Sequence, residues 1–273
     1  MTVDSRRRPF RIGAVNYLNS KPLIEGLSEL APEVELVLDY PSRLADQLSA
    51  GQLDVGLVPS IACLLEPDYE VLSDACVAAH GPVLSVKLYF RKEPREVRRL
   101  ALDAGSRTSA ALARILLAER HQLVPDFEPL PLDQSTAESD ADAVLLIGDR
   151  AIHPPAETFS QTWDLGEEWT NWTGLPFVFA MWGTQTQSDL EGLAEILSAA
   201  RDRGVKNLEA IARREAPLLG IAEHLAIDYL TKNLYYRLGT AERKGLSLFH
   251  RLAVKHGLAP EGIDLVFRHS ACA

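Results

Sequence analysis

Apolar runs of strand length alternate with helical patterns through the first third of the chain. Residues 11–18 and 53–60 are short apolar runs, and residues 34–40 alternate apolar with polar side chains. Between them, residues 21–30 and 41–52 carry apolar positions at helical spacing. Strands and helices of these lengths, in this order, predict βαβ units and a mainly parallel sheet.

A second α/β unit is predicted further along the chain. It consists of a strand over residues 98–105, a helix over 106–120, an edge strand over 126–132 and a buried strand over 141–148. From residue 187 onward the apolar side chains form the stripes of amphipathic helices.

Two extended segments, near residues 85–92 and 176–183, join the two units. Two crossings mean that the middle unit is inserted into the first. We therefore predict an α/β fold of two lobes, with helices flanking the sheets and a cleft between the lobes. Lobe I consists of residues 1–90 and 183–273, and lobe II of residues 91–182.

Composition is ordinary for a globular protein: of 273 residues, 47% are hydrophobic and 24% are charged. The net charge of −10 argues against nucleic acid and anionic membranes as partners, because both bind basic surfaces. Three cysteines without a C-x-x-C pair, and a polar start without a signal peptide, predict reduced thiols in the cytoplasm. The sequence leaves the oligomeric state open.

Neutral hydrogen-bonding side chains lie where predicted strands meet helices. Asn16, Asn19 and Ser20 follow the first strand, and Pro59 and Ser60 end the third. Ligands of open α/β sheets bind at the carboxyl ends of strands, so these residues are candidates for a binding site. The alternative is that they only form turns and helix caps.

A polar turn opens the helix predicted in the second unit. It consists of Gly105, Ser106, Arg107, Thr108 and Ser109. Free amide donors and partial positive charge at a helix N-terminus suit a carboxylate or a phosphate, and the hydroxyls add donors. The alternative is a simple cap by Ser106.

A further candidate turn, Gly148-Asp149-Arg150, follows the last buried strand. The seven histidines show no H-x-x-x-H or H-E-x-x-H spacing, so we expect no metal site. Walker, G-x-G-x-x-G and G-x-S-x-G motifs are also absent from the sequence, so we expect no nucleotide cofactor and no hydrolase elbow.

Six segments in one order resemble the chorismate dehydratase family of the futalosine route to menaquinone, over residues 10–268. These segments are NYLNSKPL, GQLDVGLVPS, GPVLSVKLYF, LDAGSRTSAALARILL, LLIGD and WTGLPFVFAMW. The resemblance implies a type II periplasmic-binding-protein-like fold. It also implies a hydro-lyase that converts chorismate to 3-[(1-carboxyvinyl)oxy]benzoate.

The resemblance also assigns roles to individual residues. Asn19 matches the family's active-site asparagine, and Ser85 matches a serine that faces it. The turn 105–109 matches the substrate cradle, and Gly148 with Asp149 matches its neighbouring turn. The expected substrate site is completed by Ser20, Pro59, Ser60 and Phe177.

Two alternatives remain beside the dehydratase. A sister lyase, which releases dihydroxynaphthoate from a cyclic futalosine derivative, carries a histidine where this chain has Gly148. Glycine cannot act as a base, which favours the dehydratase. A small-anion binding protein of the same fold would bind without reacting. Because neither Asn19 nor Ser85 is a competent base, we expect the substrate's own enolpyruvyl carboxylate to accept the proton.

Overall fold

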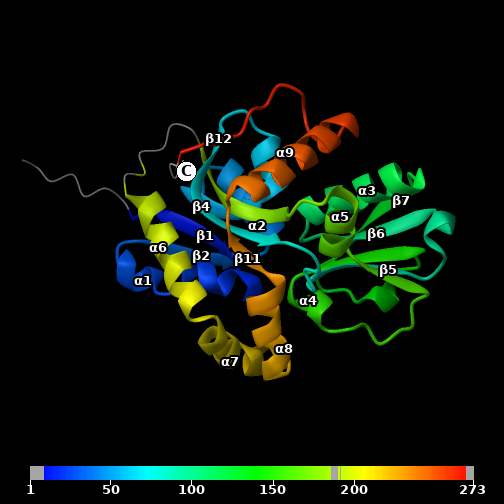
Figure 1. The fold of residues 1–273 in the computed structure, drawn as a ribbon, viewed down its shortest axis with the longest axis horizontal. Coiled ribbons are helices and arrows are strands. Elements are labelled where there is room, and N and C mark those ends of the chain that lie inside the picture. Colours follow the sequence, from blue (N-terminus) through cyan, green and yellow to red (C-terminus); the bar gives the residue numbers. More distant parts are fainter. Residues whose placement is uncertain (1–8, 186–189, 191, 269–273) are drawn as a thin grey trace, which may run out of the picture.

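The computed structural model describes residues 9–185, 190 and 192–268. Residues 187–189 and 191, at the start of the predicted helical region, and Cys272 lie outside the described residues. Over the described ranges, helices pack around two separate sheets (Figure 1). The predicted α/β class is therefore confirmed.

The first sheet has seven strands and contains both early and late parts of the chain. Its strands are β1 (Arg11–Val15), β2 (Glu35–Asp39), β3 (Val55–Pro59), β4 (Tyr69–Ala79), β10 (Phe177–Gln185), β11 (Tyr235–Arg237) and β12 (Val266–Phe267). The spatial order is β11-β4-β10-β3-β1-β2, and β12 pairs with β4. β1 runs parallel to β2 and β3, as the βαβ pattern predicts, whereas β10 runs antiparallel to β3 and β4.

The second sheet has five strands from the middle of the chain. They are β5 (Val86–Phe90), β6 (Arg99–Asp103), β7 (Asp126–Leu130), β8 (Ala143–Ile147) and β9 (Gln161–Asp164). Their order is β7-β6-β8-β5-β9. β6 is parallel to β7 and β8, and β5 is antiparallel to β8 and β9.

The chain passes from one sheet to the other slightly before the predicted lobe boundaries. β5 pairs within the second sheet, although it lies in predicted lobe I. β10 pairs within the first sheet, although its larger part lies in predicted lobe II. The chain therefore crosses between the sheets in the segments 80–85 and 165–176, because β5 belongs to the second sheet and β10 to the first. The division into lobes at residues 90 and 183 stays a prediction.

Helices cover the sheets and join their strands. The α-helices are α1 (Leu27–Leu30), α2 (Pro41–Ser49), α3 (Thr108–His121), α4 (Asp149–Ile152), α5 (Leu165–Thr173), α6 (Leu193–Lys206), α7 (Leu208–Leu219), α8 (Glu223–Asp228) and α9 (Thr240–Lys255). The 3₁₀ helices are η1 (Leu18–Ile24), η2 (Ser60–Leu64), η3 (Pro94–Glu96) and η4 (Thr136–Glu138), and η5 (Tyr229–Asn233) is a π-helix. Among the described residues, no helix has the length and apolar character needed to cross a membrane.

Local chemistry explains several helix boundaries. Pro41 stands in the first turn of α2, and Gly51 adopts a left-handed φ of 66° just after that helix. The Asp164 side chain accepts hydrogen bonds from Gly166 N and Glu167 N and so caps α5. The predicted helix over residues 21–30 is instead the 3₁₀ helix η1 followed by one turn of α1.

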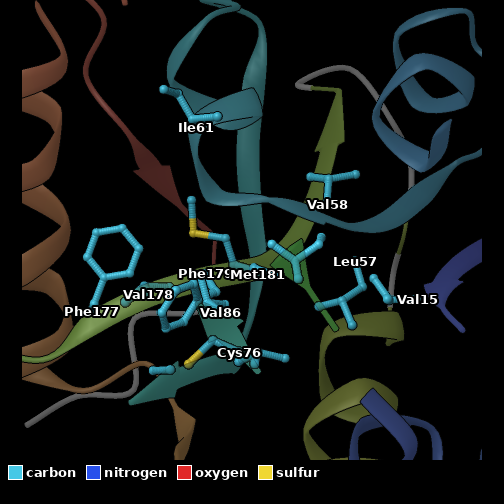
Figure 2. Close-up of a cluster of buried hydrophobic side chains, with 14 of the residues drawn as sticks. Val15, Leu57, Val58, Ile61, Cys76, Val86, Phe177, Val178, Phe179 and Met181 are labelled. Atoms are coloured by element: carbon cyan, nitrogen blue, oxygen red, sulfur yellow. The ribbon is translucent and has the colours of Figure 1, made fainter. Parts of the chain in front are cut away.

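An aromatic cluster anchors the C-terminal helix to β10. Phe177 lies 5.0 Å from the Phe249 ring and 5.1 Å from the Trp169 ring, measured between centroids. Figure 2 shows Phe177 beside helix α9, with Phe179 and Met181 further along the strand. Helix α9 contacts both β10 and α3, so it links elements of the two sheets (Figure 1).

Candidate active site

A cleft of about 520 Å³, including its open mouth, lies between the two sheets. Strand ends of both sheets line it, and its apolar lining consists of Val15, Pro41, Pro59, Val77, Val83, Val86, Ile147, Phe179 and Ala180. Its polar lining consists of Tyr17, Asn19, Ser85, Ser106, Arg107, Thr108 and Ser109, and Gly148 completes it. Asn19, Pro59, Ser85, residues 106–109 and Gly148 thus lie together in the cleft, and their roles in binding and catalysis stay predictions.

Two predicted serines serve the backbone and do not line the cleft. Ser20 is fully buried, and its hydroxyl donates to the carbonyls of Tyr17, at 2.9 Å, and Val15. Ser60 is also fully buried and donates to Val178 O at 2.8 Å. Both hydroxyls therefore satisfy carbonyl groups at the ends of strands.

Three other predicted residues do not line the cleft. Gly105 N donates to Asp103 Oδ1 at 2.9 Å. The Asp149 carboxylate accepts from Leu18 N at 3.1 Å, and burial raises its pKa to about 6. Phe177 belongs to the aromatic cluster, and Phe179, two residues along the same strand, lines the cleft.

The start of α3 forms one wall of the cleft, and three of its side chains already have partners. Ser106 Oγ accepts from Ser109 N at 3.2 Å. Thr108 Oγ1 accepts from Ile61 N at 3.3 Å, across from the other sheet. The Arg107 guanidinium pairs with Asp46 Oδ1 at 2.5 Å. Thr108 and Arg107 therefore join the two halves of the molecule as well as lining the cleft.

A strained turn presents Ser85 on the opposite side. Leu84 has a φ of 65°, which side chains other than glycine rarely adopt. Ser85 N donates to Val83 O at 2.8 Å, which closes a three-residue turn around Leu84. The Asp164 carboxylate holds this turn by accepting from Val83 N at 2.9 Å and Leu84 N at 2.6 Å. Backbone strain of this kind persists where the surroundings enforce it, often at functional sites.

The position of Gly148 depends on Tyr17, which no sequence motif marks as part of the site. A Cβ atom on Gly148 would lie 2.5 Å from Tyr17 Cε2, and the φ of Gly148 is 63°. Only glycine fits here, and the tyrosine ring fills the space of a side chain. Tyr17 Oη is buried without a hydrogen-bond partner, and burial, followed by the charge of Asp103, raises its pKa well above the usual value.

Tyr229, on the π-helix η5, is a second residue that no sequence motif marks as part of the site. Its ring is fully buried, and its hydroxyl has no hydrogen-bond partner. Burial raises the pKa of this phenol, and the adjacent Ser85 and Asn19 side chains partly offset the rise. Its place in an apolar helical stripe predicts burial but not contact with the site. Nothing in the local sequence signals that contact.

Metal-binding side chains do not gather in the described part of the chain: no three His, Cys, Asp or Glu residues there could hold an ion together. Asn, Ser, Thr and Tyr supply most of the polar lining of the cleft. These side chains can bind an anion and orient it. The expectation that no metal or cofactor takes part stays a prediction.

Comparison with known proteins identifies the family. A family model described as menaquinone biosynthesis matches residues 10–255. The chain is 32% identical over 265 residues to a protein of Thermus thermophilus named chorismate dehydratase, covering 89% of this chain and 94% of the relative. This chain belongs to the menaquinone-biosynthesis family.

Solved structures show the fold that this family member adopts. Protein AF1704 from Archaeoglobus fulgidus superposes with a TM-score of 0.71 at 18% identity, covering 93% of this chain and 99% of that one. The periplasmic aliphatic sulphonate binding protein of Escherichia coli superposes with a TM-score of 0.63 at 15% identity, covering 98% and 94%. The predicted periplasmic-binding-protein-like fold is therefore confirmed.

Proposed function

We propose that this chain converts chorismate to 3-[(1-carboxyvinyl)oxy]benzoate as a hydro-lyase of menaquinone biosynthesis. The Thermus relative carries the name of this activity. The observation that carries the proposal is the chemistry of the cleft. Among the described residues that line it, polar groups are hydroxyls, one amide and one guanidinium, with no carboxylate or imidazole. Such a site suits an anionic substrate that brings its own base.

The reaction itself needs little driving force from the protein. The ring proton at the ether-bearing carbon passes to the enolpyruvyl carboxylate, and the carboxylic acid so formed passes it to the departing hydroxyl group. One water leaves, the ring becomes aromatic, and the carboxylate is regenerated. Holding the two groups in attack geometry can lower a barrier by roughly 7–11 kcal/mol. Orientation is therefore the main contribution asked of the cleft.

Different lining residues hold different groups of the substrate in this orientation. Asn19 and Ser85 bind the enolpyruvyl carboxylate and the departing hydroxyl, and Tyr17 adds a third donor beside Gly148. The ring carboxylate lies at the start of α3, where Ser106, Ser109 and the free amides donate to it. Each charge-assisted hydrogen bond of this kind contributes about 1.5–3 kcal/mol. The apolar strand ends exclude water around the ring.

The decisive experiment mixes the purified protein with chorismate and follows the products by mass spectrometry and ultraviolet absorbance. We expect an aromatic product lighter than chorismate by one water. Tight binding of chorismate that stays intact would instead establish a small-anion binding protein. Release of dihydroxynaphthoate from a cyclic futalosine derivative, with chorismate untouched, would establish the sister lyase. The expected cytoplasmic location also stays part of this proposal.

A further inference from the structure

The phenol of Tyr229 is a buried polar group that the dehydration scheme above does not use. The residue is fully buried, and its hydroxyl has no hydrogen-bond partner. Buried polar groups are paired in the great majority of cases, and each exception needs an explanation. An unpaired hydroxyl costs about 1–3 kcal/mol, whereas phenylalanine would fill the same space without this cost.

The backbone places Tyr229 directly behind the cleft. The π-helix η5 continues α8 and begins at Tyr229. Single π turns occur frequently at functional sites, because they re-aim a side chain within a helix. Asn233, at the end of the same turn, donates to Pro82 O at 2.9 Å and so ties η5 to the segment that carries Ser85.

Two lining residues influence the Tyr229 hydroxyl. Burial raises the pKa of this phenol, and the Ser85 and Asn19 side chains lower it again in part. The Ser85 hydroxyl is itself buried without a partner, although it lines the cleft. Both hydroxyls are therefore buried and unpaired, one on a residue that lines the cleft and one on a residue that the cleft-lining Ser85 and Asn19 influence.

We propose that Tyr229 is a positioning residue for the dehydration: its hydroxyl donates to Ser85 Oγ and accepts from Asn19 Nδ2 when the substrate is bound. This inference rests on the proposed function. A tyrosine hydroxyl has one hydrogen to donate and lone pairs to accept. The Ser85 hydrogen and the second Asn19 N–H are then both free to point at the substrate. Tyr229 itself touches no reacting atom.

The first test is Tyr229→Phe, measured by chorismate turnover and thermal unfolding. We expect kcat to fall about 10- to 100-fold and KM to change less than about threefold. We expect the melting temperature to stay the same or rise, because an unpaired buried hydroxyl has been removed. An unchanged kcat would overturn the proposal, as would a loss confined to KM.

The matched control is Tyr89→Phe. The Tyr89 hydroxyl is also buried without a partner, but Tyr89 packs against Phe159 in the second sheet's own cluster and does not line the cleft. We expect this variant to keep the kcat of the parent protein. An equal loss in both variants would show that removing any buried phenol slows turnover, and would overturn the specific role.

A double-mutant cycle tests the route through Ser85. If Tyr229 acts by orienting Ser85, the variant carrying both Ser85→Ala and Tyr229→Phe loses little more activity than Ser85→Ala alone. Fully additive losses would overturn the proposal. Failure of the parent protein to convert chorismate would remove the proposed function and this inference with it. Conversion by the parent together with an unimpaired Tyr229→Phe variant would remove this inference alone.

Discussion

The two sides of the cleft differ in whether their polar groups already have partners. On the helix side, residues 106–109, the Ser106, Arg107 and Thr108 side chains bond to Ser109 N, Asp46 and Ile61 N. On the tyrosine side, which we define as Tyr17, Ser85 and Tyr229, every hydroxyl is buried and unpaired.

This difference separates two tasks. Arg107 and Thr108 have partners in the other half of the molecule, so they hold the two sheets in place around the cleft and have limited capacity left for a ligand. Ser106 only accepts from Ser109 N and keeps its hydroxyl hydrogen to donate. Unpaired hydroxyls reduce stability, so their presence favours a role that begins when the substrate arrives. We therefore expect substitutions on the tyrosine side to lower kcat, and those on the helix side to change KM or stability.

The largest effect is expected for Asn19→Ala, next to the tyrosine side. We expect kcat to fall about 100- to 1,000-fold, because an oriented donor to a charged group is lost. Circular dichroism and thermal melting check that the fold is intact. The control is Asn16→Ala at the same strand end, since Asn16 is exposed and its side-chain oxygen accepts from Lys21. Near-normal turnover by Asn19→Ala would contradict the expected difference in kcat effects between the two sides.

Asp149→Asn tests the support beneath the tyrosine side through its pH dependence. Burial raises the pKa of Asp149 to about 6, above the ordinary value of an unfolded chain. The parent protein therefore has the full stability of this group below about pH 4 and loses it as the pH rises through 6. We expect the variant to be more stable than the parent by up to about 3 kcal/mol at pH 7.5.

Urea unfolding at several pH values measures this difference. The advantage of Asp149→Asn should disappear below about pH 4, where both side chains are neutral. A constant difference across the pH range would show that the buried charge of Asp149 is not its cause.

Ser109→Ala separates binding from orientation on the helix side. Ser109 lines the cleft and is buried. We expect KM to rise about tenfold with kcat nearly constant, because a hydrogen bond to the ring carboxylate is lost in ground state and transition state alike. Thr108→Val is the companion variant: since Thr108 accepts from Ile61 N, it should instead lower the free energy of unfolding by about 1 kcal/mol. A kcat loss in Ser109→Ala equal to that of Asn19→Ala would contradict the comparison.

The smallest effect is expected for Arg107→Ala. Its guanidinium is paired with Asp46, whose side chain is largely exposed, so it is not free to bind the substrate closely. We expect KM to rise only about two- to threefold at low salt, and less at high salt because ions screen the remaining attraction. Steady-state kinetics at two ionic strengths measure this. A rise above tenfold would show that Arg107 leaves Asp46 for the substrate.

The sequence by itself determined the order of strands and helices and part of the site. It predicted the elements around Val55–Pro59 and Thr108–His121 because hydrophobic periodicity is a local property that the sequence shows without the tertiary structure. The polar turn before α3 and the cleft positions of Asn19 and Ser85 followed from position and from family resemblance. The short strands β11 and β12 went unpredicted, since two or three residues carry no period and pair only because β4 offers them free backbone groups.

Only the tertiary structure decided which side chains complete the site. Phe177 and Phe179 lie two residues apart on β10, but the pairing with β4 shifts register between Val178 and Ala180. Phe177 packs against Phe249, and Phe179 lines the cleft. Tyr17 fills the space that Gly148 leaves, and Tyr229 reaches Asn19 from a helix far along the chain. Such contacts depend on how distant elements pack, and the local spacing of residues in the sequence does not predict that packing.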